Sequence, residues 1–188
     1  IELAQKACTR LPTQASYKDI ERGFGLQVRV DQLPIGKDGV YIEEETKIII
    51  NSNVTSEERR LFTAFHELIH YLIREDEDLY SYLHDAYEDT NAFDRTIELV
   101  CNIGAAELIL PRERVRKLID SQGFSLELVP QLCQQDCVSG PAALIQLVQN
   151  APNRCYGVVC EFGIPPDLDN MKQQAFFQKQ KANTLYIL

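Results

Sequence analysis

The sequence predicts an α+β fold in which a small sheet packs with helices around one long helix that carries an HExxH motif. Residues 26–30 alternate apolar and polar side chains as a half-buried strand does, and residues 39–42 and 47–51 are short apolar runs. Longer segments on either side repeat apolar residues at helical spacing instead. Three short strands set between helices predict a sheet that helices cover on one side.

Residues 1–23 are predicted to be helical, with Pro12 as an interruption and the glycines at 23 and 25 as the end. After the strands, a long helix is expected to begin at Thr55, because Thr55 and Glu58 fit a capping box that satisfies two unpaired backbone amides. Apolar residues three or four positions apart define the face of this helix that packs on the core: Leu61, Phe65, Leu68 and Leu72.

This helix also carries the run HELIH at residues 66–70. Residues four apart share one face of a helix, so His66 and His70 can bind one divalent metal ion together. Glu67 lies about 100° round the helix from His66 and can take a proton from a water molecule that the metal activates. The motif therefore predicts a zinc-type peptidase site with Glu67 as the base.

A third metal ligand is expected on the apolar helix of residues 97–110, which Pro111 ends. A carboxylate at Glu98 inside such a helix is costly unless it is paired or bound to metal, and Asn102 one turn later can orient it or a histidine. Asp76, six residues after His70, and His84, the remaining histidine, are alternatives for this ligand.

The composition is that of an ordinary globular protein: 188 residues, 45% apolar and 25% charged. No apolar run approaches the roughly 20 residues of a membrane helix, so no membrane segment is expected. The chain starts at Ile1 without methionine and stops within a strand-like run, residues 184–188, so we expect it to be a fragment.

Net charge is −9, and eight acids without a lysine or arginine fall between residues 75 and 94. This stretch is either a solvated loop or a negative rim that attracts a basic partner. General nucleic-acid binding is not expected, because it requires basic patches.

The chain has six cysteines, which we expect to be reduced in a cytoplasmic protein. Cys101 is expected to be buried as a small hydrophobic residue. A second zinc site at the other paired cysteines is not expected, because three and four residues separate the members of each pair, where two are usual: Cys133 and Cys137, Cys155 and Cys160.

Residues 112–150 are predicted to be helical, with Ser125 and Ser139 as caps and Pro141 in a first turn. The segments 126–134 and 141–149 have the outline of a helix-turn-helix, but the second lacks lysine and arginine, so duplex DNA binding is not expected. A strand at 156–160, a linker at Pro165-Pro166 and a helix after Asp167 complete the prediction.

Three motifs in this order resemble the ImmA/IrrE family of metallopeptidases: EERRLFTAF before HELIH, then ELVCN at 98–102 and AAELILP at 105–111. The likeness covers residues 15–150. It implies a zincin-like peptidase domain at 1–122, a helix-turn-helix-like domain at 123–164, and a linker with the start of a GAF-like domain at 165–188. Phe65 departs from the alanine that is usual before the first histidine.

The resemblance also implies a function. Such proteins are similar to stress-activated proteases that cleave a repressor of the xenobiotic-response-element (XRE) type and so switch on DNA-repair genes. His66, His70 and Glu98 would then hold zinc or manganese, with Glu67 as base. The transition state needs a stabilising side chain, for which the sequence offers Tyr41, Tyr80, Tyr82 and His84 without ranking them. The alternative function is a metal-stabilised regulator that binds a partner without cutting it.

Overall fold

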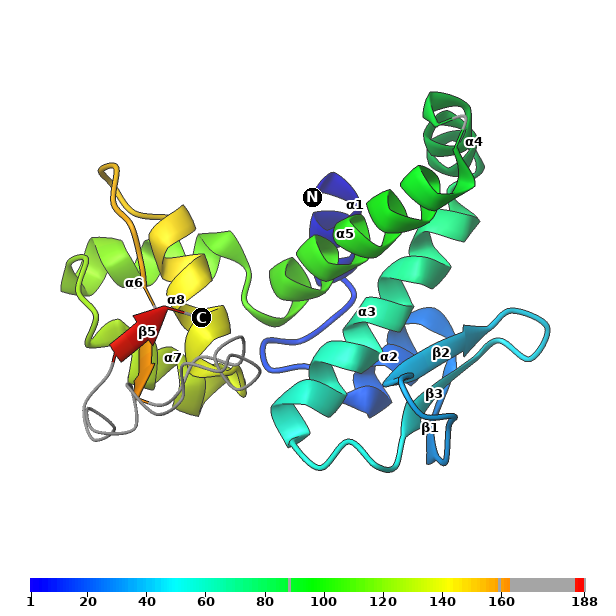
Figure 1. Cartoon of the computed structure of the whole chain (residues 1–188), viewed down its shortest axis with the longest axis horizontal. Coiled ribbons are helices and arrows are strands. Elements are labelled where there is room, and N and C mark those ends of the chain that lie inside the picture. Colours follow the sequence, from blue (N-terminus) through cyan, green and yellow to red (C-terminus); the bar gives the residue numbers. More distant parts are fainter. Residues whose placement is uncertain (88, 159, 163–184, 188) are drawn as a thin grey trace, which may run out of the picture. The chain divides into compact units, whose positions relative to one another are not determined.

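The computed structural model of the chain describes residues 1–87, 89–158, 160–162 and 185–187 (Figure 1). It consists of two compact units, Ile1–Asn150 and Ala151–Leu188, which are treated separately below. The predicted linker at Pro165-Pro166 and the helix expected after Asp167 lie outside the described residues.

The first unit contains eleven helices and strands, and their order confirms the predicted α+β class. They are α1 (Glu2–Cys8), α2 (Tyr17–Phe24), β1 (Gln27–Asp31), β2 (Gly39–Ile42), β3 (Lys47–Asn51), α3 (Glu57–Glu75), α4 (Glu77–Ala86), α5 (Thr90–Ile109), α6 (Arg112–Gln122), α7 (Leu128–Asp136) and α8 (Gly140–Gln149). The second unit contributes an antiparallel pair, β4 (Cys160–Phe162) and β5 (Leu185–Ile187).

The three predicted strands form one sheet in the order β1-β3-β2. β1 runs parallel to β3, and β2 runs antiparallel to it with Tyr41 opposite Ile48. β2 is therefore an edge strand. Ile48 and Ile50 of β3 are fully buried, which anchors the sheet in the core.

Helix α3 is the centre of this core, with β2 and β3 on one side and α5 on the other (Figure 1). The predicted apolar face is confirmed at Phe65 and Leu68, which are buried. α3 and α5 approach closely at Gly104, where an added Cβ would lie 2.8 Å from side-chain atoms of Ile69. This close contact brings the residues of α5 within reach of the HExxH residues on α3.

Several predicted helix ends need correction. α3 is capped by Ser56, whose hydroxyl accepts from the Arg59 amide at 3.2 Å, and not by Thr55. α5 begins at Thr90 rather than near Ile97, because Asp89 caps it with a bond from the Asn91 amide. The first helical prediction is interrupted for longer than expected, since residues 9–16 are not helical.

The acidic stretch is mostly helical, and a solvated loop, one of its two predicted forms, is not what the structure shows. Most of it forms α4 and the first turn of α5, and none of the residues of α4 is buried. Asp76 caps α4, accepting a hydrogen bond from the Leu79 amide at 3.0 Å. The described part of the stretch is thus mostly helical, and α4 exposes its acids to solvent.

Helices α6, α7 and α8 share a second hydrophobic core, around Val115, Leu132 and Leu147. Ser139 caps α8 as predicted, with a bond from the Ala142 amide. Ser125 does not cap α7, whose N-cap residue is Glu127. The domain limits at 122 and 164 stay predictions.

In the second unit, residues 156–158 are not part of a strand, so the strand predicted from Tyr156 was placed too early. Cysteines 8, 101, 133, 137 and 155 are not paired in disulfides, and the side chain of Cys160 is outside the described ones. The expectation of reduced cysteines stays a prediction. Among the described helices, none combines the length and the apolar character that crossing a membrane requires.

Candidate metal centre

His66 and His70 lie one turn apart on α3, and their Nε2 atoms are 3.1 Å from each other. Two nitrogens bound to one tetrahedral zinc ion at about 2.05 Å would lie about 3.3 Å apart. Both imidazoles are largely buried, with 14% and 22% of their side chains exposed. The helix therefore presents the two nitrogens at the separation that a shared metal ion requires.

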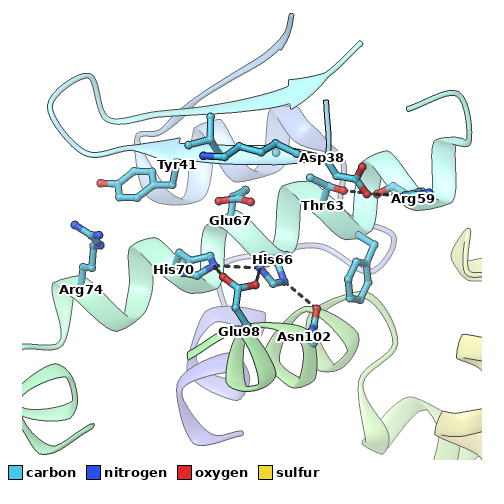
Figure 2. Close-up of a pocket in the computed structure, with 15 residues that line it drawn as sticks. Asp38, Tyr41, Arg59, Thr63, His66, Glu67, His70, Arg74, Glu98 and Asn102 are labelled. Carbon is cyan, nitrogen blue, oxygen red and sulfur yellow. Dashed lines mark hydrogen bonds and ion pairs between the residues drawn. The ribbon is translucent and has the colours of Figure 1, made fainter. Parts of the chain in front are cut away.

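Glu98 reaches this pair from α5. Its Oε2 is 3.2 Å from His66 Nε2 and its Oε1 is 3.4 Å from His70 Nε2 (Figure 2). The argument that an unpaired carboxylate at Glu98 would be costly does not hold, because 59% of its side chain is exposed. Glu98 remains the candidate for the third ligand because its carboxylate lies close to both imidazoles, and not because it is buried.

Asn102 contacts the other nitrogen of the first histidine. Its Oδ1 lies 3.0 Å from His66 Nδ1. A carboxamide oxygen only accepts hydrogen bonds, so Nδ1 must carry the hydrogen and the Nε2 lone pair stays free for a metal. The atom through which Asn102 can orient His66 is therefore Nδ1.

Glu67 projects from α3 toward β2, whereas the imidazoles face α5 (Figure 2). The pKa of its carboxyl is raised to about 7, mainly by burial and to a smaller extent by the charge of Glu98. A backbone hydrogen bond at Tyr41 and the charge of Lys37 lower this pKa in part. A base with a pKa near neutrality is well matched to moving protons at neutral pH.

A glycine allows the strand to lie this close to Glu67. At Gly39 an added Cβ would lie 2.4 Å from Thr63 Cγ2 and 3.1 Å from Glu67 Oε1. No sequence motif marks Gly39 as part of the site. The available signal was a glycine at the start of the strand predicted at 39–42, because glycine in a strand often marks a close approach of the backbone.

The raised pKa of Glu67 should make the metal-free protein less stable as pH rises. Between the ordinary value of 4.5 and about 7, the folded state binds more protons than the unfolded state, so the free energy of unfolding falls with pH. Each pKa unit corresponds to at most about 1.4 kcal/mol. In urea titrations without metal, Glu67→Gln should become more stable relative to the parent as pH rises from 4.5 to about 7. Parallel stability curves would show that Glu67 is not buried in this way.

His66, Glu67, His70, Glu98 and Asn102 all line one open pocket of about 650 Å³ (Figure 2). Tyr41 lines it too, so this candidate for stabilising the transition state is brought to the site. The Tyr41 ring packs edge-on against Tyr71 at 5.6 Å. Burial raises its pKa, with nearby carboxylates adding to the shift, so its hydroxyl stays protonated near neutral pH.

Two ion pairs connect α3 to the chain around β2. Arg59, in the first turn of α3, binds Asp38 at 2.6 Å (Figure 2). Arg74, in the last turn, pairs with Glu43. Both arginines line the pocket. These pairs were not predicted, since nothing in the sequence indicates which exposed charges meet across elements.

The other candidates lie outside this pocket. Asp76 is occupied as the cap of α4. His84 is 68% exposed and its ring contacts Phe93 at 5.7 Å, and Tyr80 contacts the same phenyl ring. Tyr82 is 70% exposed. The structure therefore does not bring these residues to the two imidazoles.

Cys101 was expected only to fill space, but it lies beside the imidazoles of His66 and His70. Its Sγ and one nitrogen of each imidazole all lie within 4.8 Å of one another. Cys101 is fully buried, and burial raises the pKa of its thiol, with Glu98 and Glu67 adding to the rise. Its place three residues after Glu98, on the same helical face, is the signal that was available in the sequence.

The donor set fits a first-row divalent metal ion. Two neutral imidazoles and a carboxylate are the ligands of many catalytic zinc sites, and the adjoining pocket leaves room for water and a substrate. A carboxylate with a pKa near 7 beside such a set defines a site of the metallopeptidase class.

Comparison with known proteins agrees with this class. The family described as the IrrE N-terminal-like domain, a peptidase family, matches residues 22–134, and the chain belongs to it. The resemblance drawn from the three motifs is thereby confirmed.

Two curated relatives carry the name radiation response metalloprotease IrrE. The protein of Deinococcus deserti is 39% identical over 128 residues, which is 67% of this chain and 45% of the relative. That of Deinococcus radiodurans is 33% identical over 135 residues, 71% of this chain and 40% of the relative. The chain thus spans less than half the length of these relatives.

A solved structure, named as a Mycobacterium tuberculosis transcriptional regulator, is similar with a TM-score of 0.60. It is 14% identical, and the match covers 85% of this chain and 50% of that one. At this identity the likeness shows a shared fold and nothing about function.

Proposed function

We propose that this chain is a metal-dependent, site-specific endopeptidase that inactivates a transcriptional repressor of the helix-turn-helix type in a stress or DNA-damage response. One observation supports it above the others: two imidazoles and the Glu98 carboxylate converge in an open pocket that also contains a carboxyl with a pKa of about 7. The radiation-response names belong to the relatives and motivate the biological setting.

His66, His70 and Glu98 would hold the metal ion, zinc or manganese. The ion supplies Lewis-acid activation of water and of the peptide carbonyl. Glu67 accepts the proton of the attacking water and then delivers it to the leaving amine. Asn102 keeps His66 in the tautomer that leaves Nε2 free. Tyr41, protonated and in the same pocket, can donate a hydrogen bond to the oxyanion.

The partner is expected to be a basic protein, as a DNA-binding repressor of the XRE type is. α4 and its flanks carry acids on exposed positions without a compensating lysine or arginine between residues 75 and 94. Fixed negative charges on an exposed helix favour the approach of a positively charged substrate.

The direct test is to incubate the purified chain with zinc or manganese and a candidate repressor. A gel, with mass spectrometry of the new termini, should show cleavage at one bond. Cleavage at many bonds would contradict site specificity.

The alternative is a metal-stabilised regulator that binds its partner without cutting it. This alternative gives no role to a near-neutral carboxyl facing an open pocket. Stable binding without any cut, in protein of full metal content, would favour the regulator.

Association with the substrate should weaken as salt is raised. From about 50 to 300 mM salt, screening shortens the range of the acidic surface, so the apparent binding constant should fall. Neutralising Glu77, Asp78 and Asp85 should weaken binding at low salt and flatten this dependence. Asp76 is left intact because it caps α4.

A matched control removes the same charge elsewhere. Glu2, Asp120 and Glu127 are exposed and lie on or beside other helices, so their neutralisation should leave the salt response close to that of the parent. An equal response in both triple variants would mean that the acids of α4 act only through net charge.

A further inference from the structure

The candidate metal site contains one donor more than the proposed mechanism uses. We infer that the Cys101 sulfur is a ligand to the metal ion held by His66 and His70, and that it makes the site prefer zinc and other thiophilic ions over manganese. The inference rests on the proposed metal site but does not depend on peptide cleavage.

The position of Cys101 supports direct ligation. Cys101 follows Glu98 by three residues on α5, so both side chains leave the same helical face. Its sulfur lies within 4.8 Å of one nitrogen on each imidazole. In a tetrahedral site with bonds of about 2.3 Å to sulfur and 2.05 Å to nitrogen, these atoms would be about 3.6 Å apart. A side-chain adjustment of about 1 Å closes the difference.

Burial distinguishes the two donors of α5. Cys101 is fully buried between α5 and α3, whereas Glu98 is exposed for 59% of its side chain. The sulfur is thus held against the imidazoles by packing, and the carboxylate can move into solvent. The site therefore has a fixed soft donor and a mobile hard donor.

The softness of the ligands determines which metal ions this site binds most tightly. Thiolate favours zinc, cobalt and cadmium, while manganese prefers carboxylate and water. Two imidazoles and a carboxylate accommodate both kinds of ion. On binding, the thiol proton leaves to solvent, because thiolate is the ligand form. Cys101 would then be the residue that decides between the two metals.

Four protein donors around one ion would leave no free position for water. Four protein ligands close a zinc site, whereas catalysis needs a position for water. With both Cys101 and Glu98 bound, water would reach a zinc ion only if one of these donors left or the ion took a fifth ligand. The arrangement with Cys101 bound and all four donors engaged is a resting form.

The test uses cobalt as a spectroscopic substitute for zinc. Metal-free parent, Cys101→Ala, Cys101→Ser and the control Cys133→Ser are loaded with Co²⁺ under a reductant without thiols. Cys133 is a free, half-buried cysteine on α7, which makes it a matched control. A sulfur-to-cobalt charge-transfer band is expected in the parent and in Cys133→Ser, and should be lost in both Cys101 variants.

A competition measurement gives the second readout. The ratio of zinc affinity to manganese affinity should fall at least about tenfold in the Cys101 variants, which is the size of effect seen when groups around a metal are removed. Metal-free circular dichroism checks folding, and if Cys101→Ala does not fold, the parent spectrum and Cys101→Ser still decide.

The outcomes separate the inference from the proposed function. A parent that binds cobalt without a charge-transfer band, or a band that survives in the Cys101 variants, overturns the ligation by Cys101 and leaves the metal site intact. An unchanged affinity ratio overturns the selectivity. A parent that binds none of these ions overturns the proposed function as well.

Discussion

Replacing Glu67 with glutamine should lower peptide hydrolysis by about two or more orders of magnitude, the size of a general base's contribution. Glutamine keeps the length of the side chain, and its carbonyl oxygen can still accept the backbone hydrogen bond at Tyr41. It cannot accept the proton of water. Single-turnover cleavage of the candidate repressor, or of a peptide substrate, with metal content measured on the same samples, checks the result.

Metal binding should survive this substitution, because Glu67 faces β2 while His66 and His70 face α5 (Figure 2). Glu75→Gln is the matched control: it makes the same chemical change on the same helix, at an exposed position outside the pocket. Cleavage at the parental rate by metal-loaded Glu67→Gln would end the proposed mechanism. Loss of metal from this variant would instead make Glu67 part of the metal site.

The parts of the site within one helix could be predicted from the sequence. The spacing of His66 and His70 fixes their shared face, and the apolar residues between them fix which side packs on the core. The predicted strands at 39–42 and 47–51 were also correct, because short apolar runs between turns permit few alternatives.

The parts that depend on how elements meet could not be predicted. The approach of β2 to Glu67 depends on Gly39, whose role appears only when the strand lies against α3. The environment of Glu98 was misjudged, because an apolar helix in the sequence still exposes one face, on which Leu99 is 58% exposed. Cys101 was read as a packing residue for the same reason: the sequence does not say what its buried face contacts.

The acidic stretch shows a further limit. Its charges suggested a loop, yet the caps at Asp76 and Asp89 start helices within it. A short polar side chain can be a cap or a solvated acid, and the sequence pattern alone does not distinguish these roles.

Substituting Glu98 should lower both metal affinity and activity, since its carboxylate contacts both imidazoles. We expect Glu98→Gln and Glu98→Ala to bind metal at least about tenfold more weakly. The Glu98 variants should remain folded, because replacing an exposed side chain changes the free energy of unfolding by only about 0.5 kcal/mol. Metal loss would therefore not be a consequence of unfolding.

The two alternative ligands provide the comparison that decides the matter. Asp76→Asn keeps a residue that can cap α4, and His84→Ala removes an exposed ring, so both variants should fold and retain full metal content. Metal content of the purified variants, measured side by side, is the readout. If the Glu98 variants stay fully loaded while Asp76→Asn or His84→Ala loses metal, the third ligand is that residue. If all of them stay loaded, Cys101 is the donor that remains within reach of both imidazoles, and a Glu98→Ala, Cys101→Ala double variant should then lose the metal.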